Sequence, residues 1–105
     1  MSMLELHDDP EDYFRLGRGT EIVFTRRAAK MLCFMLADRG FQLIGLDGGI
    51  HHPGIGFEAR IEASWTRNVK ANDKMEARLI NLQAAESMGE YSDEYNGYTI
   101  VTREI

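Results

Sequence analysis

Cysteine, proline and tryptophan are scarce in this chain of 105 residues, which contains one cysteine, two prolines and one tryptophan. A single cysteine cannot form an internal disulfide, and it excludes a metal site built from several thiolates. Cys33 stands in the apolar run MLCFML, where we expect an inert thiol packed in the core. Such sparse use of cysteine fits a reducing compartment.

Long apolar runs and an excess of basic residues are missing too. No segment approaches the roughly 18 to 20 apolar residues of a membrane-spanning helix, and the N-terminus lacks the basic start and apolar core of a signal peptide. We therefore expect a cytoplasmic protein without a membrane partner. The formal net charge of −5 argues against non-specific nucleic-acid binding, which needs lysine and arginine to displace counterions from phosphates.

Acidic residues are concentrated in two places. Residues 1–12 contain five carboxylates and residues 86–96 contain four, and neither stretch has a lysine or arginine. These are either solvated segments or parts of a negative surface that a basic partner recognises. The length predicts one domain, residues 1–105, in which residues 1–20 form an acidic N-terminal extension.

Hydrophobic periodicity predicts an α+β fold. Residues 8–17 are expected to form one helical turn, and strands are expected at residues 21–24, 41–47, 57–65 and 99–105. Two helices fall between these strands, which gives the order β-α-β-β-α-β. An antiparallel sheet of about four strands with both helices on one face would bury these patterns together. The order matches a ferredoxin-like split βαβ arrangement.

Cap residues set the bounds of the two predicted helices. Thr25 can cap the first helix, which should end at Gly40. Asn72 or Asp73 can cap the second, with Glu76 completing a capping box. The first helix should bury Ala28, Met31, Leu32, Met35 and Leu36. The second should bury Met75, Leu79, Leu82 and Met88.

The stretch from Gly45 to Trp65 holds five of the ten glycines and two of the three histidines. Its segment GGIHHPGI is expected to be the loop of a hairpin, because glycine and proline favour turns. The strand that follows alternates between apolar and polar residues, which predicts one face in the core and one in water. Its core face should consist of Phe57, Ala59, Ile61, Ala63 and Trp65.

Candidate chemistry in this stretch is weak. Neighbouring side chains such as His51 and His52 tend to diverge in extended chain, whereas a zinc site needs three or four convergent ligands. A buried Cys33 would have a raised pKa and would be a poor nucleophile. We therefore expect a binding module without metal or cofactor. An acid–base site at Asp47 and nearby carboxylates, a small hydrolase or metal-dependent enzyme using the histidines, and a nucleic-acid-binding domain stay open as alternatives.

Several blocks carry a resemblance to a known family. They are AAKMLCFMLADRGFQLIGLDGG at residues 28–49, the loop HHPGIGF, ASWT at 63–66 and NGYT at 96–99. With these blocks in this order, the chain resembles the colicin E-five immunity proteins, whose partner toxin cuts tRNA anticodon loops. The first 20 residues, the histidine pair and the segment EYSDEY depart from that pattern, which leaves open a related toxin such as one of contact-dependent inhibition.

The resemblance implies a cytoplasmic antidote that performs no chemistry. It would bind the basic C-terminal ribonuclease domain of a toxin one-to-one and fill the cleft that holds RNA, without touching nucleic acid itself. Carboxylates would stand where phosphates stand, and net charge would speed the encounter. Trp65 could serve as an aromatic anchor or pack in the core. The expected toxin contacts are Asp47, His51, His52, Glu58, Glu62, Trp65, Glu90, Tyr91, Asp93 and Glu94.

Overall fold

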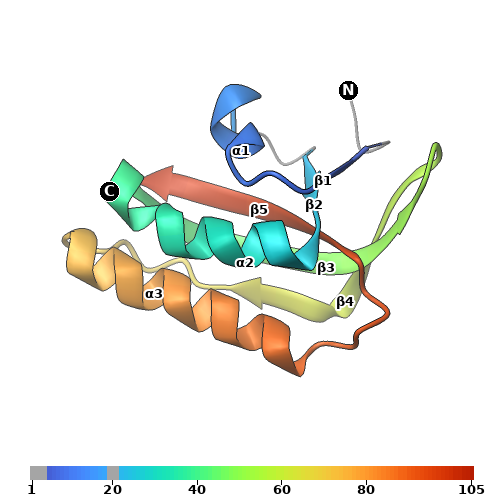
Figure 1. Ribbon diagram of the computed structural model, residues 1–105. Helices are drawn as coiled ribbons and strands as arrows, with labels where there is room; N and C mark the ends of the chain where they lie inside the picture. Colours follow the sequence, from blue (N-terminus) through green and yellow to red (C-terminus); the bar gives the residue numbers. More distant parts are fainter. Residues whose placement is uncertain (1–4, 19–21) are drawn as a thin grey trace.

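The computed structural model describes residues 5–18 and 22–105, and it contains a five-stranded mixed sheet with two main helices (Figure 1). The strands are β1 (Leu6–His7), β2 (Val23–Phe24), β3 (Phe41–His52), β4 (Gly56–Thr66) and β5 (Gly97–Glu104). The helices are α1 (Asp12–Arg15), α2 (Arg26–Met35) and α3 (Lys74–Ser87), with 3-10 turns at Ala37–Arg39 and Met88–Glu90. Glu21, part of the first predicted strand, lies outside the described residues.

The strand order is β1-β2-β5-β3-β4, with β1 and β2 parallel and the other neighbours antiparallel. The α+β class is confirmed, but the ferredoxin-like arrangement is wrong, because a split βαβ unit would place β2 in parallel beside β4. Instead β5 lies between β2 and β3. The pairing of β5 with β3 runs from Phe41 opposite Glu104 to Gly49 opposite Gly97, so these long strands form the centre of the sheet.

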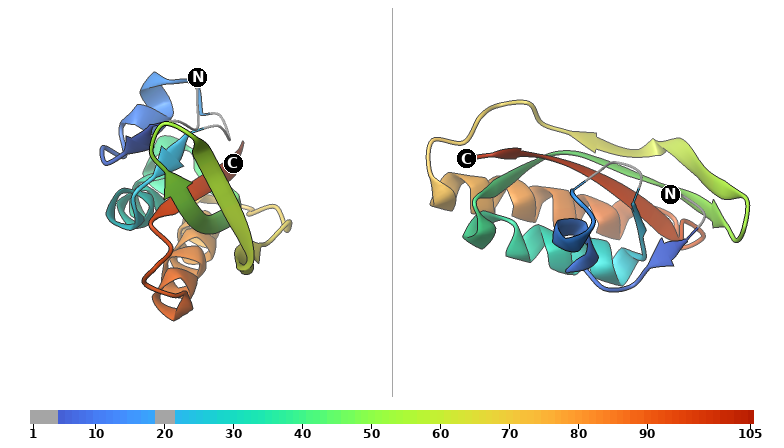
Figure 2. Two further views of the ribbon diagram at one scale, coloured as in Figure 1. Left: turned by 90° about the vertical axis from the view of Figure 1, so that its right-hand side faces the viewer. Right: turned by 90° about the horizontal axis from the view of Figure 1, so that it is seen from above.

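Helices α2 and α3 lie side by side on one face of the sheet, and the far end of the β3–β4 hairpin projects past them (Figures 1 and 2). The main core lies between this helical layer and the sheet. Its largest fully buried side chains include Tyr98, Phe24, Leu32, Leu43 and Leu46. A smaller cluster under the start of α3 contains Ala37, Ala71, Ala77 and Ile80.

The predicted start of α2 and the stop at Gly40 are confirmed, but the α-helix itself ends at Met35 and the 3-10 turn Ala37–Arg39 completes the segment. The Thr25 hydroxyl accepts a hydrogen bond from the Ala28 amide at 3.1 Å, and Gly40 ends the segment in a left-handed conformation with φ of 89°. The buried face includes Ala28, Ala29, Leu32, Cys33 and Leu36. Met31, predicted to be buried, is exposed because it points away from the sheet.

The cap of α3 is confirmed at Asp73, which accepts from the Glu76 amide; the reciprocal bond of Glu76 comes from the amide of Asn72, the residue before the cap. The predicted apolar face is wrong except at Met88: Met75, Leu79 and Leu82 are exposed. The face that packs on α2 and the sheet is built from three alanines, one isoleucine and one amide, namely Ala77, Ala84, Ala85, Ile80 and Asn81. Alanine allows close packing, and the Asn81 amide oxygen accepts from the Leu43 backbone N–H at 2.7 Å.

The β3–β4 hairpin differs from its prediction in two ways. First, β3 continues through His52, so the turn contains only residues 53–55. Second, the alternation of β4 breaks at a register shift opposite residues 47–49, and Ile61 is 91% exposed instead of buried. Ala59 is exposed as well, whereas Ala63 is buried.

Residues 5–18, which we call the N-terminal segment, pack against the sheet. The strand β1 pairs with β2, and the helical turn predicted at residues 8–17 is confirmed as α1. Tyr13 is buried, and its hydroxyl shares a hydrogen bond with that of Thr102 at 2.9 Å. This contact places α1 beside β5 where the short β2 has ended (Figure 1).

Candidate functional site

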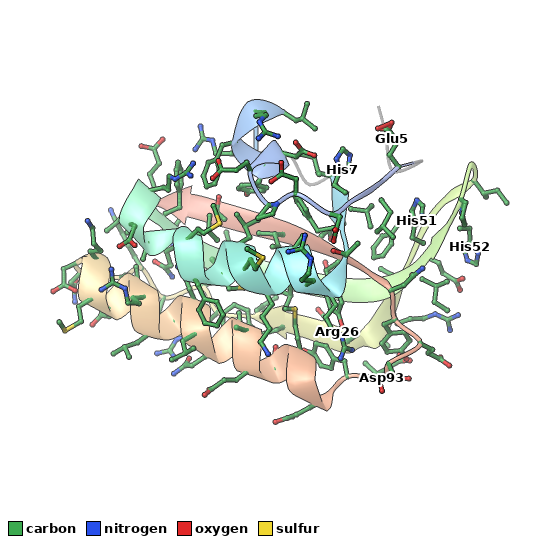
Figure 3. All side chains as sticks on the ribbon, viewed as in Figure 1. Glu5, His7, Arg26, His51, His52 and Asp93 are labelled. Carbon is green, nitrogen blue, oxygen red and sulfur yellow. The ribbon has the colours of Figure 1, made fainter. Side chains whose placement is uncertain are left out.

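Arg26, the first residue of α2, holds residues 90–96 against the body of the protein; we call these residues the connector. Its Nη1 lies 3.3 Å from Asp93 Oδ1, and Figure 3 shows the two side chains together near the end of α3. Its Nη2 donates to three further oxygens, the carbonyls of Tyr91 (3.1 Å) and Ser92 (3.0 Å) and the hydroxyl of Tyr98 (3.0 Å). One guanidinium therefore fixes the course of an irregular segment.

The carboxylates of the connector point into solvent. The Asp93 side chain is fully exposed although it pairs with Arg26. Glu90 and Glu94 are exposed, and their carboxylates form no ion pair or hydrogen bond within residues 5–18 and 22–105. Their negative charge lacks internal compensation, so it is available to a basic partner.

Glu62 extends this negative surface onto β4. Its carboxylate accepts a hydrogen bond from the Tyr95 hydroxyl, which ties the connector to the edge of the sheet. That bond lowers the pKa of Glu62 and raises the pKa of Tyr95, because it favours the ionised carboxylate and the neutral phenol. Glu62 therefore stays charged at neutral pH.

Glu58 lies farther along the hairpin between two cationic or basic side chains. His52 Nε2 is 3.2 Å from Glu58 Oε1, and Arg60 Nη2 is 3.3 Å from Glu58 Oε2. Its charge is thus partly compensated. The five predicted acidic contacts outside β3 follow β4 and the connector, and we call them the acidic face: Glu58, Glu62, Glu90, Asp93 and Glu94.

The two histidines diverge, as their adjacency predicts. His51 is 5% exposed, and its backbone N–H donates to the Asn96 amide oxygen at 2.7 Å, which attaches the hairpin to the connector. His52 points outward to Glu58 (Figure 3). The pair therefore presents one imidazole to solvent and one to the interior, which does not make two ligands for one ion.

The remaining predicted contacts are engaged in the fold. Asp47 accepts a hydrogen bond from the Ser64 hydroxyl at 2.7 Å across the hairpin. Trp65 is partly buried against both core clusters, and Tyr91 packs against the larger one. Trp65 thus has a core role, and its exposed part is what a partner could reach.

Sequence reasoning missed the pairing of the N-terminal acids. Four carboxylates of the N-terminal segment form ion pairs with three arginines, of which one lies in the segment itself and two lie farther along the chain. Arg27 pairs with Asp8 at 3.0 Å, Arg39 with Glu11 at 2.5 Å, and Arg15 with both Asp9 at 3.0 Å and Asp12 at 2.6 Å. The Thr25 hydroxyl, besides capping α2, donates to Asp8 at 2.6 Å. No local pattern reveals these contacts, because two of the three arginines lie far along the chain.

An open groove of about 790 Å³ separates the N-terminal segment from the hairpin. Its walls carry Asp8, Asp9 and Asp12 on one side and His51 and Pro53 on the other. All three aspartates already have arginine or histidine partners, with His7 Nδ1 2.9 Å from Asp12. The groove therefore offers less uncompensated charge than the acidic face.

Two of the candidate chemistries, a cysteine nucleophile and a metal site, can be compared with the structure. Burial raises the pKa of the Cys33 thiol to about 12, so it is not a nucleophile at neutral pH. Across the described ranges, no group of three or more histidine, cysteine, aspartate or glutamate side chains is placed to hold a metal ion. The arrangement can present charge to a macromolecule.

Comparison with known proteins identifies the family. No helix in the described part of the chain is long and apolar enough to cross a membrane. No protein-family model matches the sequence. However, the chain is 31% identical over 100 residues to the immunity protein CdiI of Burkholderia pseudomallei, in an alignment that covers 94% of this chain and 90% of that protein. With this identity along nearly the whole of both proteins, the chain belongs to the family of CdiI immunity proteins.

Proposed function

We propose that the protein neutralises the toxin of a contact-dependent-inhibition system by binding its C-terminal domain one-to-one in the cytoplasm. The observation that carries the proposal is the acidic face, an exposed negative surface on which three of the five carboxylates form no ion pair among the described residues, in a member of the CdiI immunity proteins. Binding alone would suffice for protection, so the protein itself needs no catalytic group.

We infer further that the toxin domain is a ribonuclease that cuts tRNA. A ribonuclease cleft is basic because it binds phosphates, so the carboxylates of the acidic face would occupy phosphate positions and be steered there rapidly. An aromatic side chain such as Tyr91 or Trp65 would lie where a base stacks. The proposed contacts are Asp47, His51, His52, Glu58, Glu62, Trp65, Glu90, Tyr91, Asp93 and Glu94.

The test is a tRNA-cleavage assay with the purified C-terminal domain of the toxin encoded beside this protein. We expect cleavage to fall in proportion to added protein and to stop near one molar equivalent. A non-cognate basic ribonuclease serves as the control, and it should keep cutting, which separates specific binding from sequestration of RNA. Undiminished cleavage at a molar excess would refute the proposal for that toxin.

A further inference from the structure

The register shift in β4 forms a large bulge at the edge of the sheet, in which residues 60–63 lie opposite Gly48 alone. Asp47 pairs with Ser64, and Gly49 pairs with Ala59, so β3 advances by two residues while β4 advances by five. The extra residues of β4 therefore loop out opposite Gly48. Bulges of this kind redirect side chains and occur beside functional sites.

Two glycines on β3 make room for the bulge. A Cβ on Gly49 would lie 2.1 Å from the Glu58 carbonyl oxygen, and one on Gly48 would lie 2.7 Å from the Tyr98 ring. Ala63, at the inner end of the bulge, is fully buried. The Asp-Gly-Gly block of the sequence thus has a structural explanation, which is close backbone approach.

The outer end of the bulge presents Ile61. This side chain is 91% exposed, more than any other large apolar residue in the described ranges. It is presented from a fixed position, because Ala63 is buried on one side and Glu62 is bonded to Tyr95 of the connector. An exposed apolar side chain next in the chain to Glu62, which is tied to the acidic connector, has the anatomy of an interface anchor within a polar rim.

The charges around Ile61 select among partners. The acidic face has five carboxylates, against which Arg26 and Arg60 supply the paired cations. Nucleic acid would be repelled by this excess of negative charge. A second copy of the chain is also poorly suited, because a two-fold contact would place the carboxylates of both copies against each other. A basic protein domain fits.

We propose that Ile61 is the apolar anchor of the surface that binds the toxin domain, inserted into an apolar pocket whose rim carries lysine or arginine opposite Glu62 and the connector. The inference rests on the proposed function and adds to it a residue that sequence periodicity assigns to the core. The bulge and its glycines serve to hold this side chain outward.

The test measures binding of the cognate toxin domain to Ile61→Ala, with Ile61→Val as the conservative variant and Leu79→Ala as the matched control. Leu79 is 57% exposed on the outer face of α3. We expect Ile61→Ala to raise Kd about tenfold or more, mainly through faster dissociation, and the other two variants to change it less than about threefold. Melting temperatures should stay close to wild type, because neither residue is buried.

The outcomes separate the two proposals. If wild-type protein binds the toxin and Ile61→Ala binds equally well, the anchor is wrong and the proposed function stands. If wild-type protein does not bind, both fall. Sedimentation of the protein alone provides a further check: a dimer that Ile61→Ala dissociates would assign this surface to self-association and overturn the anchor.

Discussion

In the N-terminal segment four carboxylates form ion pairs with three arginines, whereas in the connector only Asp93 forms one within residues 5–18 and 22–105. Both regions are acidic and both lie at the surface. The difference is the supply of internal cations: among the described residues, Arg15, Arg27 and Arg39 pair with carboxylates of the N-terminal segment, and only Arg26 pairs with one of the connector. Sequence charge alone does not distinguish a segment that binds its own protein from one that is free to bind another.

The internal pairs of the N-terminal segment have a structural role. Its strand β1 is only two residues long, so backbone pairing alone would hold it weakly. Tyr13 supplies apolar burial, and the arginine contacts fix the orientation of the segment beside α2. Exposed pairs of this kind contribute little one by one, but as a group they can favour one arrangement.

The largest expected effect is a slower association with the toxin domain when the carboxylates of the connector are neutralised. An equal number of carboxylates is neutralised in the N-terminal segment for comparison. The connector variant Glu90→Gln/Asp93→Asn/Glu94→Gln should slow association with the toxin domain about tenfold or more at low ionic strength and flatten its salt dependence. Its melting temperature should hardly change, because two of the three carboxylates form no ion pair or hydrogen bond with any other described residue. Stopped-flow binding at several salt concentrations measures the rate.

The matched variant is Asp8→Asn/Asp9→Asn/Glu11→Gln, which changes the net charge by the same amount. It should lower the melting temperature and leave most of the association rate intact. Equal loss of rate in both variants would show that only net charge matters, and the distinction between the two regions would then have no bearing on binding.

Local chemistry explains which parts of the fold could be predicted. The caps at Thr25 and Asp73 and the stop at Gly40 depend on neighbouring residues, so their sequence signals are sufficient. The face of α3 was misjudged because side-chain size suggested burial of Met75 and Leu79. The fold instead buries alanines, since close approach to α2 and the sheet requires small residues.

Long-range contacts explain what the sequence did not reveal. The alternation of apolar and polar residues in β4 predicts that Ile61 is buried only if the register between β3 and β4 is continuous. The register shifts instead, and the shift depends on the close approach of Gly49 to the Glu58 backbone across the hairpin. Long-range contacts also decide which acidic residues keep an uncompensated charge. Residue type predicts the acidic face, but only the fold distinguishes Asp8, which Arg27 neutralises, from Glu94, which forms no ion pair in the part of the chain that the structure describes.

A smaller effect should come from replacing single arginines at the start of α2. Arg26→Met removes three contacts to the connector and one to Tyr98 of β5, and it should cost about 1–3 kcal/mol of stability. It should also weaken toxin binding several-fold, because the carboxylates lose their fixed positions.

Arg27→Met removes contacts to Asp8 instead, so it should speed amide hydrogen exchange in β1 and leave toxin affinity unchanged. Exchange that rises in the same segment for both variants would contradict the separation of the two arginines.

The smallest expected effect is a loosening of the N-terminal segment in acid. Hydrogen bonds from Arg27 and Thr25 lower the pKa of Asp8 below its ordinary value of 3.8, and those from the Glu11 amide and Arg15 lower the pKa of Asp9. A carboxylate with a lowered folded-state pKa stabilises the fold above pH 3.8, and this contribution is lost as the pH falls through the lowered value. Amide exchange in β1, corrected for intrinsic rates, should therefore accelerate below pH 3.8. The control variant is Asp8→Asn/Asp9→Asn. It is needed because the lowered pKa of Glu62 also makes global stability fall in acid.

Because this variant has lost both carboxylates, it should show fast exchange in β1 already at neutral pH and little further acceleration in acid. If amide exchange in β1 accelerates in acid in the variant as much as in the wild type, the cause is global unfolding, and the contacts of Asp8 and Asp9 do not explain the effect.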